Sequence, residues 1–194
     1  MTKFLGTNKL KTAIFISGTG SNLKNLIKFS LLKKSPIKIG FIVSNNSKAK
    51  GLEYARKYKI KNKVLYFKNK SKDEKKIIDE FKKKEIKLIC LAGFMKILSK
   101  KFIKNFKGHI LNIHPSLLPK YKGLNTHQRV IKNNEKFSGC TVHIVNSKLD
   151  SGKIILQKKV KIKKDDTPLK LSKRILKQEH ILYPKAIKKL LTDL

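Results

Sequence analysis

Short apolar runs alternate with longer segments of helical periodicity through the first 110 residues. The apolar runs predict strands at 12–16, 37–43, 64–67, 86–91 and 110–113. After residue 22, four apolar side chains recur at a helical spacing, namely Leu23, Leu26, Ile27 and Leu31. Further helices are predicted at 47–58, from residue 71 onward and at 99–105. Strands that alternate with helices through short loops predict a doubly wound, parallel sheet.

The pattern changes after residue 114. The elements predicted there are a helix at 126–132, strands at 139–145 and 153–162, and an amphipathic helix at 169–191. Two adjacent longer strands favour an antiparallel extension of the sheet. We find neither an internal repeat nor a linker, so we expect one α/β domain over 1–194, with 1–10 as a loose lead-in. The predicted fold is a single-domain, Rossmann-like, mostly parallel sheet with an antiparallel C-terminal extension.

Composition excludes several classes of protein. No run approaches the 18 or so apolar residues that span a membrane, and lysines interrupt the N-terminus where a signal peptide would be apolar. The two cysteines, Cys90 and Cys140, sit inside apolar runs and form neither a disulfide framework nor a metal motif. A cytoplasmic protein without a membrane partner is therefore expected.

The formal charge of +36 raises the possibility of nucleic-acid binding. However, nearly all of the cations are lysines spread along every predicted element, and Arg56, Arg129 and Arg174 are the only arginines. Nucleic-acid readers favour arginine forks and interleaved aromatic rings. We interpret the lysines as a solvated surface and predict no specific nucleic-acid site. A non-catalytic, basic nucleic-acid-binding protein stays as the alternative from another class.

Polar side chains gather at the end of the strand at 110–113. Asn112 and His114 are two residues apart, so they point to the same side of an extended strand. Pro115 ends that strand, and ligands bind at the carboxyl ends of strands in open α/β sheets. The alternative is that both side chains merely satisfy a turn.

A glycine-rich turn, Gly18-Thr19-Gly20-Ser21-Asn22, joins the first predicted strand to its helix. Backbone amides at a helix N-terminus, together with a serine hydroxyl, form an anion site. The third glycine of the dinucleotide motif is missing and no Gly-Lys-Ser/Thr follows, which favours a single phosphate. The alternative is an ordinary turn in which Ser21 caps the helix.

Three other segments carry weaker signals. The apolar string 91–98 follows a strand and could line a pocket for a flat heterocycle, although such strings are more often core. Asp150 is the one acid between Glu135 and Asp165, but an Asp before Gly152 is commonly a turn residue. Glu179 lies in the last predicted helix, where a surface role is equally plausible.

The run from Asn112 to Pro119, Asn-Ile-His-Pro-Ser-Leu-Leu-Pro, resembles the signature of the folate-dependent formyltransferases, and the resemblance extends from Ile14 to about Pro184. It implies transfer of the formyl group of 10-formyltetrahydrofolate, as co-substrate, to the amine of glycinamide ribonucleotide in purine synthesis. It also implies a monomer or homodimer. No metal is expected, because no cluster of histidines, cysteines or acids has ligand spacing.

The resemblance also assigns roles to residues. The implied catalytic residues are Asn112, His114 and Asp150; the implied nucleotide-binding residues are Gly20, Ser21, Asn22 and Glu179. The implied folate-binding residues are Met95, Lys96, Ile97, Leu98, Asn112, Asn146, Ser147, Lys148, Leu149 and Asp150. Asn112 and a protonated His114 would stabilise an oxyanion, while Asp150 holds His114 and favours its charged form. A proton must also pass from the amine to N10 of the folate, through His114, Asp150 or a water.

Three residues depart from the family pattern: Lys96 stands where arginine is usual, Asn125 where histidine is usual, and Ser151 where glycine is usual. Two related activities are the nearest alternatives, namely a methionyl-tRNA formyltransferase and a formyltetrahydrofolate deformylase, in which water is the acceptor. Both resemble this sequence over the catalytic motif but usually carry an additional domain that the 194 residues do not show. We therefore expect the ribonucleotide as acceptor.

Overall fold

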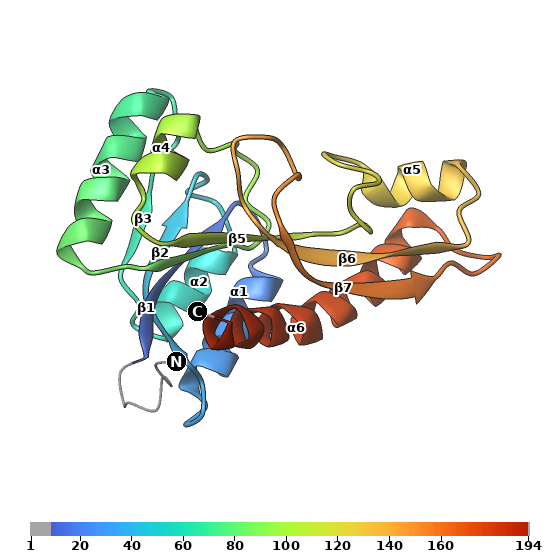
Figure 1. The fold of residues 1–194 in the computed structure, drawn as a ribbon, viewed down its shortest axis with the longest axis horizontal. Helices are drawn as coiled ribbons and strands as arrows, with labels where there is room; N and C mark the ends of the chain where they lie inside the picture. Colours follow the sequence, from blue (N-terminus) through green and yellow to red (C-terminus); the bar gives the residue numbers. More distant parts are fainter. Residues whose placement is uncertain (1–8, 194) are drawn as a thin grey trace. The chain divides into compact units, whose positions relative to one another are not determined.

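The computed structural model describes residues 9–193. Within that part the chain forms two compact units, residues 9–111 (unit 1) and residues 112–193 (unit 2). Figure 1 labels their helices and strands. The single domain that we expected stays a prediction. The predicted lead-in is shorter than expected, because Leu10 already belongs to the first strand, and residues 1–8 lie outside the described part.

A seven-stranded sheet has the order β3-β2-β1-β4-β5-β6-β7. The strands are β1 (Leu10–Ile16), β2 (Ile37–Ser44), β3 (Asn62–Val64), β4 (Leu88–Leu91), β5 (His109–His114), β6 (Phe137–Ile144) and β7 (Ile154–Lys161). The pairs β1–β2, β1–β4 and β2–β3 are parallel, and β6–β7 is antiparallel. The predicted fold class, a mostly parallel α/β sheet with an antiparallel C-terminal extension, is therefore confirmed.

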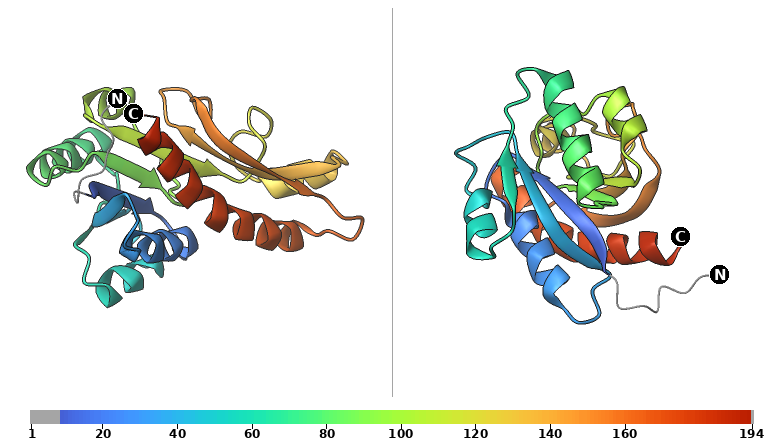
Figure 2. Two further views of the ribbon diagram at one scale, coloured as in Figure 1. Left: turned by 60° about the horizontal axis from the view of Figure 1, so that its bottom comes forward. Right: turned by 90° about the vertical axis from the view of Figure 1, so that its left-hand side faces the viewer.

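In unit 1 the helices lie on both faces of the parallel strands. They are α1 (Ser21–Leu31), α2 (Gly51–Lys57), α3 (Lys70–Lys83) and α4 (Lys100–Asn105). Helices α1 and α2 cover one face, and α3 and α4 cover the other (Figure 2). Because both faces are covered, β1 is a continuous apolar run whose residues 13–16 have no exposed surface. Phe15 contacts the edge of Phe81, with ring centroids 6.0 Å apart, in the centre of this core.

The strand order reverses between β1 and β4. From β1 the chain continues outward through β2 and β3, and then returns to place β4 on the other side of β1. In open α/β sheets, ligands bind beyond the carboxyl ends of the strands at such a reversal. This rule points to the loops after Ile16 and Leu91, which are the glycine-rich turn and the apolar string identified in the sequence.

Unit 2 pairs the β6–β7 ribbon with two helices, α5 (Thr126–Lys132) and α6 (Pro168–Thr192). Helix α6 begins at Pro168, where a missing backbone N–H costs nothing, and the Thr167 hydroxyl accepts a hydrogen bond from the Lys170 amide at 3.2 Å. Leu171 and Ile175 are fully buried on its apolar face. No described helix is long and apolar enough to cross a membrane.

Several predicted boundaries were wrong. Strand β3 spans Asn62–Val64 rather than 64–67, because the chain leaves the sheet and Phe67 takes a left-handed conformation with φ 56°. Helix α2 begins at Gly51, four residues later than predicted, after a tight turn in which the Lys48 amide donates to Asn46. Leu31 is 66% exposed, since it stands about 80° around the helix from Leu23, at the edge of the apolar face.

Candidate active site

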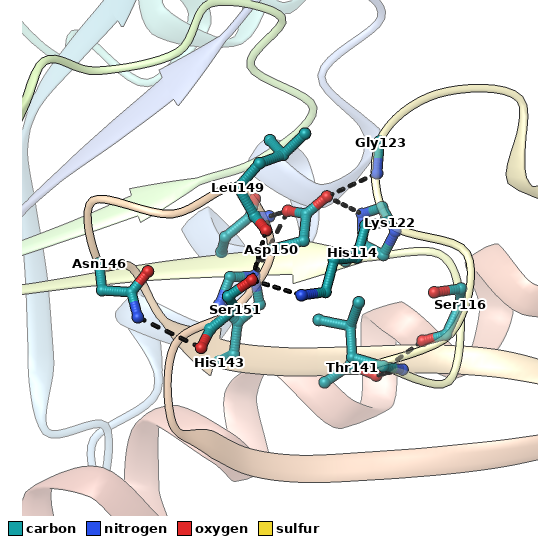
Figure 3. A network of polar contacts seen from close by, with 12 residues as sticks. His114, Ser116, Lys122, Gly123, Thr141, His143, Asn146, Leu149, Asp150 and Ser151 are labelled. Carbon is teal, nitrogen blue, oxygen red and sulfur yellow. Dashed lines mark hydrogen bonds and ion pairs between the residues drawn. The ribbon is translucent and has the colours of Figure 1, made fainter.

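The loop after β5 is fastened to the β6–β7 ribbon by polar side chains. The Thr141 hydroxyl donates to the Ser116 carbonyl at 2.6 Å and accepts from the Leu118 amide at 3.1 Å. Gln157 donates to the Leu118 carbonyl at 2.8 Å, and the Leu118–Pro119 peptide is cis. Thr141 and Gln157 come from the neighbouring strands β6 and β7, so their side chains join the loop after β5 to the ribbon. Figure 3 shows the bond between Thr141 and Ser116.

The three predicted catalytic residues lie together in unit 2. His114 Nδ1 is 3.4 Å from Asp150 Oδ2, and Asn112 Nδ2 is 3.4 Å from Asp150 Oδ1. The Gly123 amide donates to Asp150 Oδ2 at 2.8 Å, which orients the carboxylate (Figure 3). Both side chains of the His114–Asp150 pair are less than a tenth exposed. The structure thus brings the predicted group together, while its catalytic role stays a prediction.

A fourth polar residue, His143, joins this group and was missed in the sequence. Its Nδ1 is 3.0 Å from the Ile144 carbonyl, which can only accept, so Nδ1 carries the proton. Its Nε2 therefore presents a lone pair, which accepts from Asn112 Nδ2 at 3.2 Å. This bond fixes the Asn112 amide with its NH₂ group toward Asp150. The available signal was a histidine within the otherwise apolar run of β6.

His114 has an acceptor at each ring nitrogen. Its Nε2 is 2.8 Å from the Tyr121 carbonyl, so Nε2 carries a proton, and Nδ1 faces the Asp150 carboxylate. Two acceptors favour the charged ring, but burial disfavours it more strongly. The pKa of His114 lies below its ordinary value because burial outweighs the Tyr121 carbonyl and the Asp150 charge. The Asp150 charge favours the charged form of His114, but burial has the larger effect, so at neutral pH the ring at rest is mainly neutral. The role of a protonated His114 at the oxyanion stays a prediction.

Asp150 stays ionised. Burial alone raises the pKa of this carboxyl, but the neighbouring His143 ring, the hydrogen bond from the Gly123 amide and the neighbouring His114 ring together outweigh burial and leave the pKa below its ordinary value. Asp150 has a left-handed backbone, with φ 43°, which asparagine and aspartate tolerate better than other side chains. A charged acceptor is thus available beside a mainly neutral imidazole.

The turn that carries Asp150 depends on Gly152. A Cβ atom at this position would lie 1.6 Å from the Ile144 carbonyl oxygen, which is backbone and cannot swing aside. We expect Gly152→Ala to destabilise the protein by about 3 kcal/mol, the upper end of overpacking costs. Thermal unfolding measures this effect. Gly18→Ala is the matched control, because nothing lies within 4 Å of its added Cβ, and equal stability of the two variants would contradict the packing argument.

The structure accommodates two of the departures from the family pattern, Asn125 and Ser151. Asn125 precedes α5 with φ 56°, a left-handed conformation that asparagine adopts readily. The Ser151 hydroxyl donates to the Leu149 carbonyl at 2.7 Å and lies 2.5 Å from Lys122 Nζ (Figure 3). Ser151 therefore links the turn that carries Asp150 to the loop before α5.

The glycine-rich turn lies in unit 1. Gly20 is the residue before α1 and has φ 73°; an added Cβ would lie 2.5 Å from the Gly51 Cα atom. Only glycine suits both the left-handed conformation and this close approach. Ser21 is the first residue of the helix and makes no capping bond, so the alternative of Ser21 as cap was wrong. An N-terminus without a side-chain cap leaves amides for an anion.

We predict that Ser21 and Asn22 bind the phosphate of the nucleotide. Replacing both with alanine should raise the nucleotide KM about tenfold or more, because hydrogen bonds to a charged group are lost, and the folate KM much less. Steady-state kinetics with each substrate varied in turn measures the two values. Ser30→Ala, at the other end of α1, is the control. Equal changes in both KM values would place the phosphate elsewhere.

The apolar string after β4 divides into exposed and buried residues. Met95 and Ile97 are 63% and 66% exposed, and Lys96 is also exposed, so these side chains are accessible to a ligand. Leu98 is buried. The Met95 amide donates to the Ser17 hydroxyl at 2.7 Å, which ties this string to the end of β1. No feature of the sequence pointed to that role for Ser17.

The other predicted folate segment and Glu179 belong to unit 2. The Lys148 amide donates to Asn146 Oδ1 at 2.9 Å, and Leu149 is half exposed next to Asp150. Ser147 is exposed in the same turn. Glu179 is only 8% exposed on α6, so the alternative of a surface acid was wrong. The predicted site residues therefore fall into two groups: residues 20–22 and 95–98 in unit 1, and the remainder in unit 2.

Within residues 9–193, no group of three or more histidines, cysteines or acids is placed to hold a metal ion. Buried thiols offer no further chemistry: burial, with the Glu179 charge, raises the pKa of the Cys140 thiol to about 12, so it stays protonated.

Comparison with known proteins identifies the family. A family model described as formyl transferase matches residues 10–187. The phosphoribosylglycinamide formyltransferase of Haemophilus influenzae is 44% identical over 181 residues, which are 92% of this chain and 85% of that protein. The trifunctional purine biosynthetic protein adenosine-3 of Gallus gallus is 42% identical over 187 residues, and the chain spans only 18% of its length.

Solved structures agree. The crystal structure of phosphoribosylglycinamide formyltransferase from Anaplasma phagocytophilum superposes with a TM-score of 0.89 at 41% identity, covering 96% of this chain and 88% of that one. The range matched by the family model, residues 10–187, includes both the glycine-rich turn and the polar group around Asp150. The chain therefore belongs to the formyl transferase family, and the resemblance to the phosphoribosylglycinamide formyltransferases is confirmed.

Proposed function

We propose that this protein transfers the formyl group of 10-formyltetrahydrofolate to the amine of glycinamide ribonucleotide. The observation that carries the proposal is the joined group of Asn112, His114 and Asp150 at the end of β5, in a chain of this family. The names of relatives such as the Haemophilus influenzae enzyme support the ribonucleotide as acceptor. Formyl-folate is the donor that the family resemblance implies.

The reaction begins when the substrate amine attacks the formyl carbon, and a tetrahedral intermediate with an oxyanion forms. Asn112 Nδ2 is the oxyanion donor. Its bond to His143 orients the amide. The contact of Asn112 Nδ2 with Asp150 is long, at 3.4 Å, so this N–H can leave Asp150 and bond the developing oxyanion at little cost. The donor is thus already oriented before the charge appears.

His114 acts as the proton acceptor. Because the Tyr121 carbonyl holds Nε2–H, the free lone pair is on Nδ1, on the side of Asp150. Its lowered pKa leaves the ring neutral and able to take a proton from the amine. Once charged, the imidazolium donates to both Asp150 and the Tyr121 carbonyl. It then gives its proton to N10 of the folate as the bond between N10 and the formyl carbon breaks, which releases tetrahydrofolate and the formylated ribonucleotide. The charged form is therefore favoured in the transition state, when the substrate amine releases its proton, and not at rest.

The predicted binding residues keep the roles that the family resemblance implies. Residues 20–22 would hold the nucleotide phosphate and Glu179 would contact its ribose. Residues 95–98 and 146–150 would line the folate. Expectations of a cytoplasmic location, of a monomer or homodimer and of catalysis without a metal stay predictions of this proposal.

An acceptor-choice assay tests the proposal. Purified protein is given 10-formyltetrahydrofolate with glycinamide ribonucleotide, with methionyl-tRNA or with no acceptor, and both formylated product and free formate are measured. We expect formyl glycinamide ribonucleotide as the main product, with little formate. Formylated methionyl-tRNA would favour the tRNA alternative, and formate in the presence of ribonucleotide would favour the deformylase.

The lysine-rich surface leads to a separate prediction. We expect tRNA to bind only nonspecifically, with a dissociation constant of roughly 10⁻⁴ to 10⁻⁶ M at physiological salt, because the lysines are scattered. Filter binding across a salt series measures this constant, with a duplex DNA of equal charge as control. Sub-micromolar binding of tRNA that exceeds binding of the DNA would contradict this view of the surface.

A further inference from the structure

Tyr121 has an unfavourable backbone conformation next to the candidate active site. Its φ is 56°, in the left-handed region that residues with a Cβ atom seldom adopt. In this conformation its carbonyl lies 2.8 Å from His114 Nε2 and accepts the proton of that nitrogen. A left-handed conformation at such a residue persists only where the surrounding contacts hold it. The contacts of the Tyr121 side chain therefore bear on the His114 ring.

Helix α5 and the turn after it hold the Tyr121 side chain. The Tyr121 hydroxyl donates to Glu135 Oε1 at 2.8 Å and accepts from Asn133 Nδ2 at 3.0 Å. The Arg129 guanidinium lies over the Tyr121 ring, 5.3 Å from the ring centroid. The phenol is thus held both at its hydroxyl and at one face of its ring.

Arg129 also holds the main chain that follows. Its Nη1 donates to the Lys122 carbonyl at 2.7 Å and to the Leu124 carbonyl at 3.3 Å. Between these two carbonyls is Gly123, whose amide donates to Asp150 Oδ2 (Figure 3). A planar guanidinium can bond carbonyls and stack on a ring at the same time, whereas a lysine ammonium is a compact point charge. The loop 121–124 is therefore held from α5 while it contacts the catalytic pair.

The two neighbours of the neutral His114 ring favour opposite tautomers. Asp150 Oδ2, 3.4 Å from Nδ1, favours a proton on Nδ1, which would donate to the carboxylate. The Tyr121 carbonyl favours a proton on Nε2. Only the Nε2–H tautomer leaves a lone pair on Nδ1 that can accept a proton. The position of the Tyr121 carbonyl thus decides whether His114 can act as a base on the side of Asp150.

We propose that Tyr121 is a positioning residue: its contacts with α5 hold its carbonyl where it selects the Nε2–H tautomer of His114. The effect on rate rests on the proposed formyl transfer, in which Nδ1 takes the proton of the amine. Without the hydroxyl bonds or the Arg129 contacts, Tyr121 relaxes toward negative φ and turns its carbonyl away. By exchange with water, His114 then loses the proton on Nε2 and gains one on Nδ1, which donates to Asp150.

NMR of the ring nitrogens, in the full chain labelled with ¹⁵N-histidine, tests the tautomer in the resting protein. Spectra are recorded at about pH 8, above the ordinary histidine pKa of about 6.5, so that the ring is neutral. His114→Ala identifies the His114 signals by their loss. We expect mainly the Nε2–H tautomer in the unaltered protein. Tyr121→Phe and Arg129→Lys should each lower the ratio of Nε2–H to Nδ1–H about fivefold, the effect of one lost hydrogen bond.

Steady-state kinetics then separates positioning from binding. In both variants kcat should fall in step with the Nε2–H fraction, while the two KM values change little, because the predicted binding residues are unaltered. Lys120→Gln is the matched control. Lys120 Nζ bonds the same Glu135 oxygen at 3.1 Å, but its side chain is 69% exposed and its removal leaves the bond between Tyr121 and Glu135 in place. This variant should keep both the tautomer ratio and kcat.

An Nδ1–H ring in the unaltered protein, or an unchanged ratio in both Tyr121→Phe and Arg129→Lys, would overturn the proposal. An equal change in Lys120→Gln, or a lowered ratio without a fall in kcat, would also overturn it. The tautomer is measured without substrates, so it decides whether Tyr121 positions His114 independently of catalysis. Absence of formylated ribonucleotide in the acceptor-choice assay would count against the proposed function alone.

Discussion

Replacing Asn112 with alanine should lower kcat about 10²- to 10³-fold, the cost of removing one oxyanion donor. The structure explains why this single amide has such an effect. His143 Nε2 accepts one N–H, which orients the group, and the second N–H is only weakly held by Asp150, at 3.4 Å. That N–H is therefore available to the oxyanion, and no other described side-chain amide contacts Asp150.

Measurement of kcat, together with the affinity for the folate, checks this prediction. Binding should change much less than kcat, because the donor acts mainly in the transition state. Asn62→Ala, at an exposed position of β3, is the control and should leave both quantities unchanged. An Asn112→Ala variant with normal kcat, or one whose loss appears only in folate KM, would remove Asn112 from the oxyanion site.

His114→Ala and Asp150→Asn should each lower kcat strongly, and the double variant should lose far less than the product of the two losses. Residues that act as a unit are non-additive in this way. Asp150 works through His114, because its carboxylate stabilises the imidazolium that forms during the reaction. Without that charge, burial should lower the pKa of His114 further.

The pH dependence of kcat gives an independent check of the same pair. A neutral His114 is the active form in this mechanism, so activity is lost as pH falls through its pKa. In Asp150→Asn that pKa is lower, and the acid limb of the profile should move to lower pH even though the maximum rate is smaller. Losses that simply multiply, with an unmoved acid limb, would show that Asp150 does not act through His114.

Much of the fold followed from periodicity. The alternating strands and helices of the first 110 residues were predicted correctly, because strands that are buried on both faces of a sheet leave a continuous apolar run. The two longer strands after residue 138 were also predicted correctly, because they too leave a clear apolar pattern. The bounds of short elements were not predicted correctly. The pairing of β3 depends on its neighbour β2 and not on its own apolar residues, and Leu31 is exposed at the end of α1 although it keeps the helical spacing.

The candidate site was predictable where local spacing defines geometry. A two-residue interval placed Asn112 and His114 on one side of a strand, and Asp150 stood out in a chain with few acids. His143 did not, because a single histidine in an apolar strand resembles a core residue. The Tyr121 carbonyl has no sequence signal at all, since it is a main-chain group. Burial of His114 arises from the fold, so the lowered pKa of its ring has no signal in the sequence.

The central claim is that the Asp150 group catalyses formyl transfer to the amine of glycinamide ribonucleotide. A single-turnover experiment with ¹³C-labelled formyl-folate tests it directly by rapid quench and mass spectrometry, with enzyme in excess of the formyl-folate and the ribonucleotide at a saturating concentration. We predict that label appears in the ribonucleotide at the rate of formyl-folate loss, and that Asn112→Ala slows this step about 10²-fold or more. Label found in formate, or transfer at an unchanged rate in Asn112→Ala, would contradict the account.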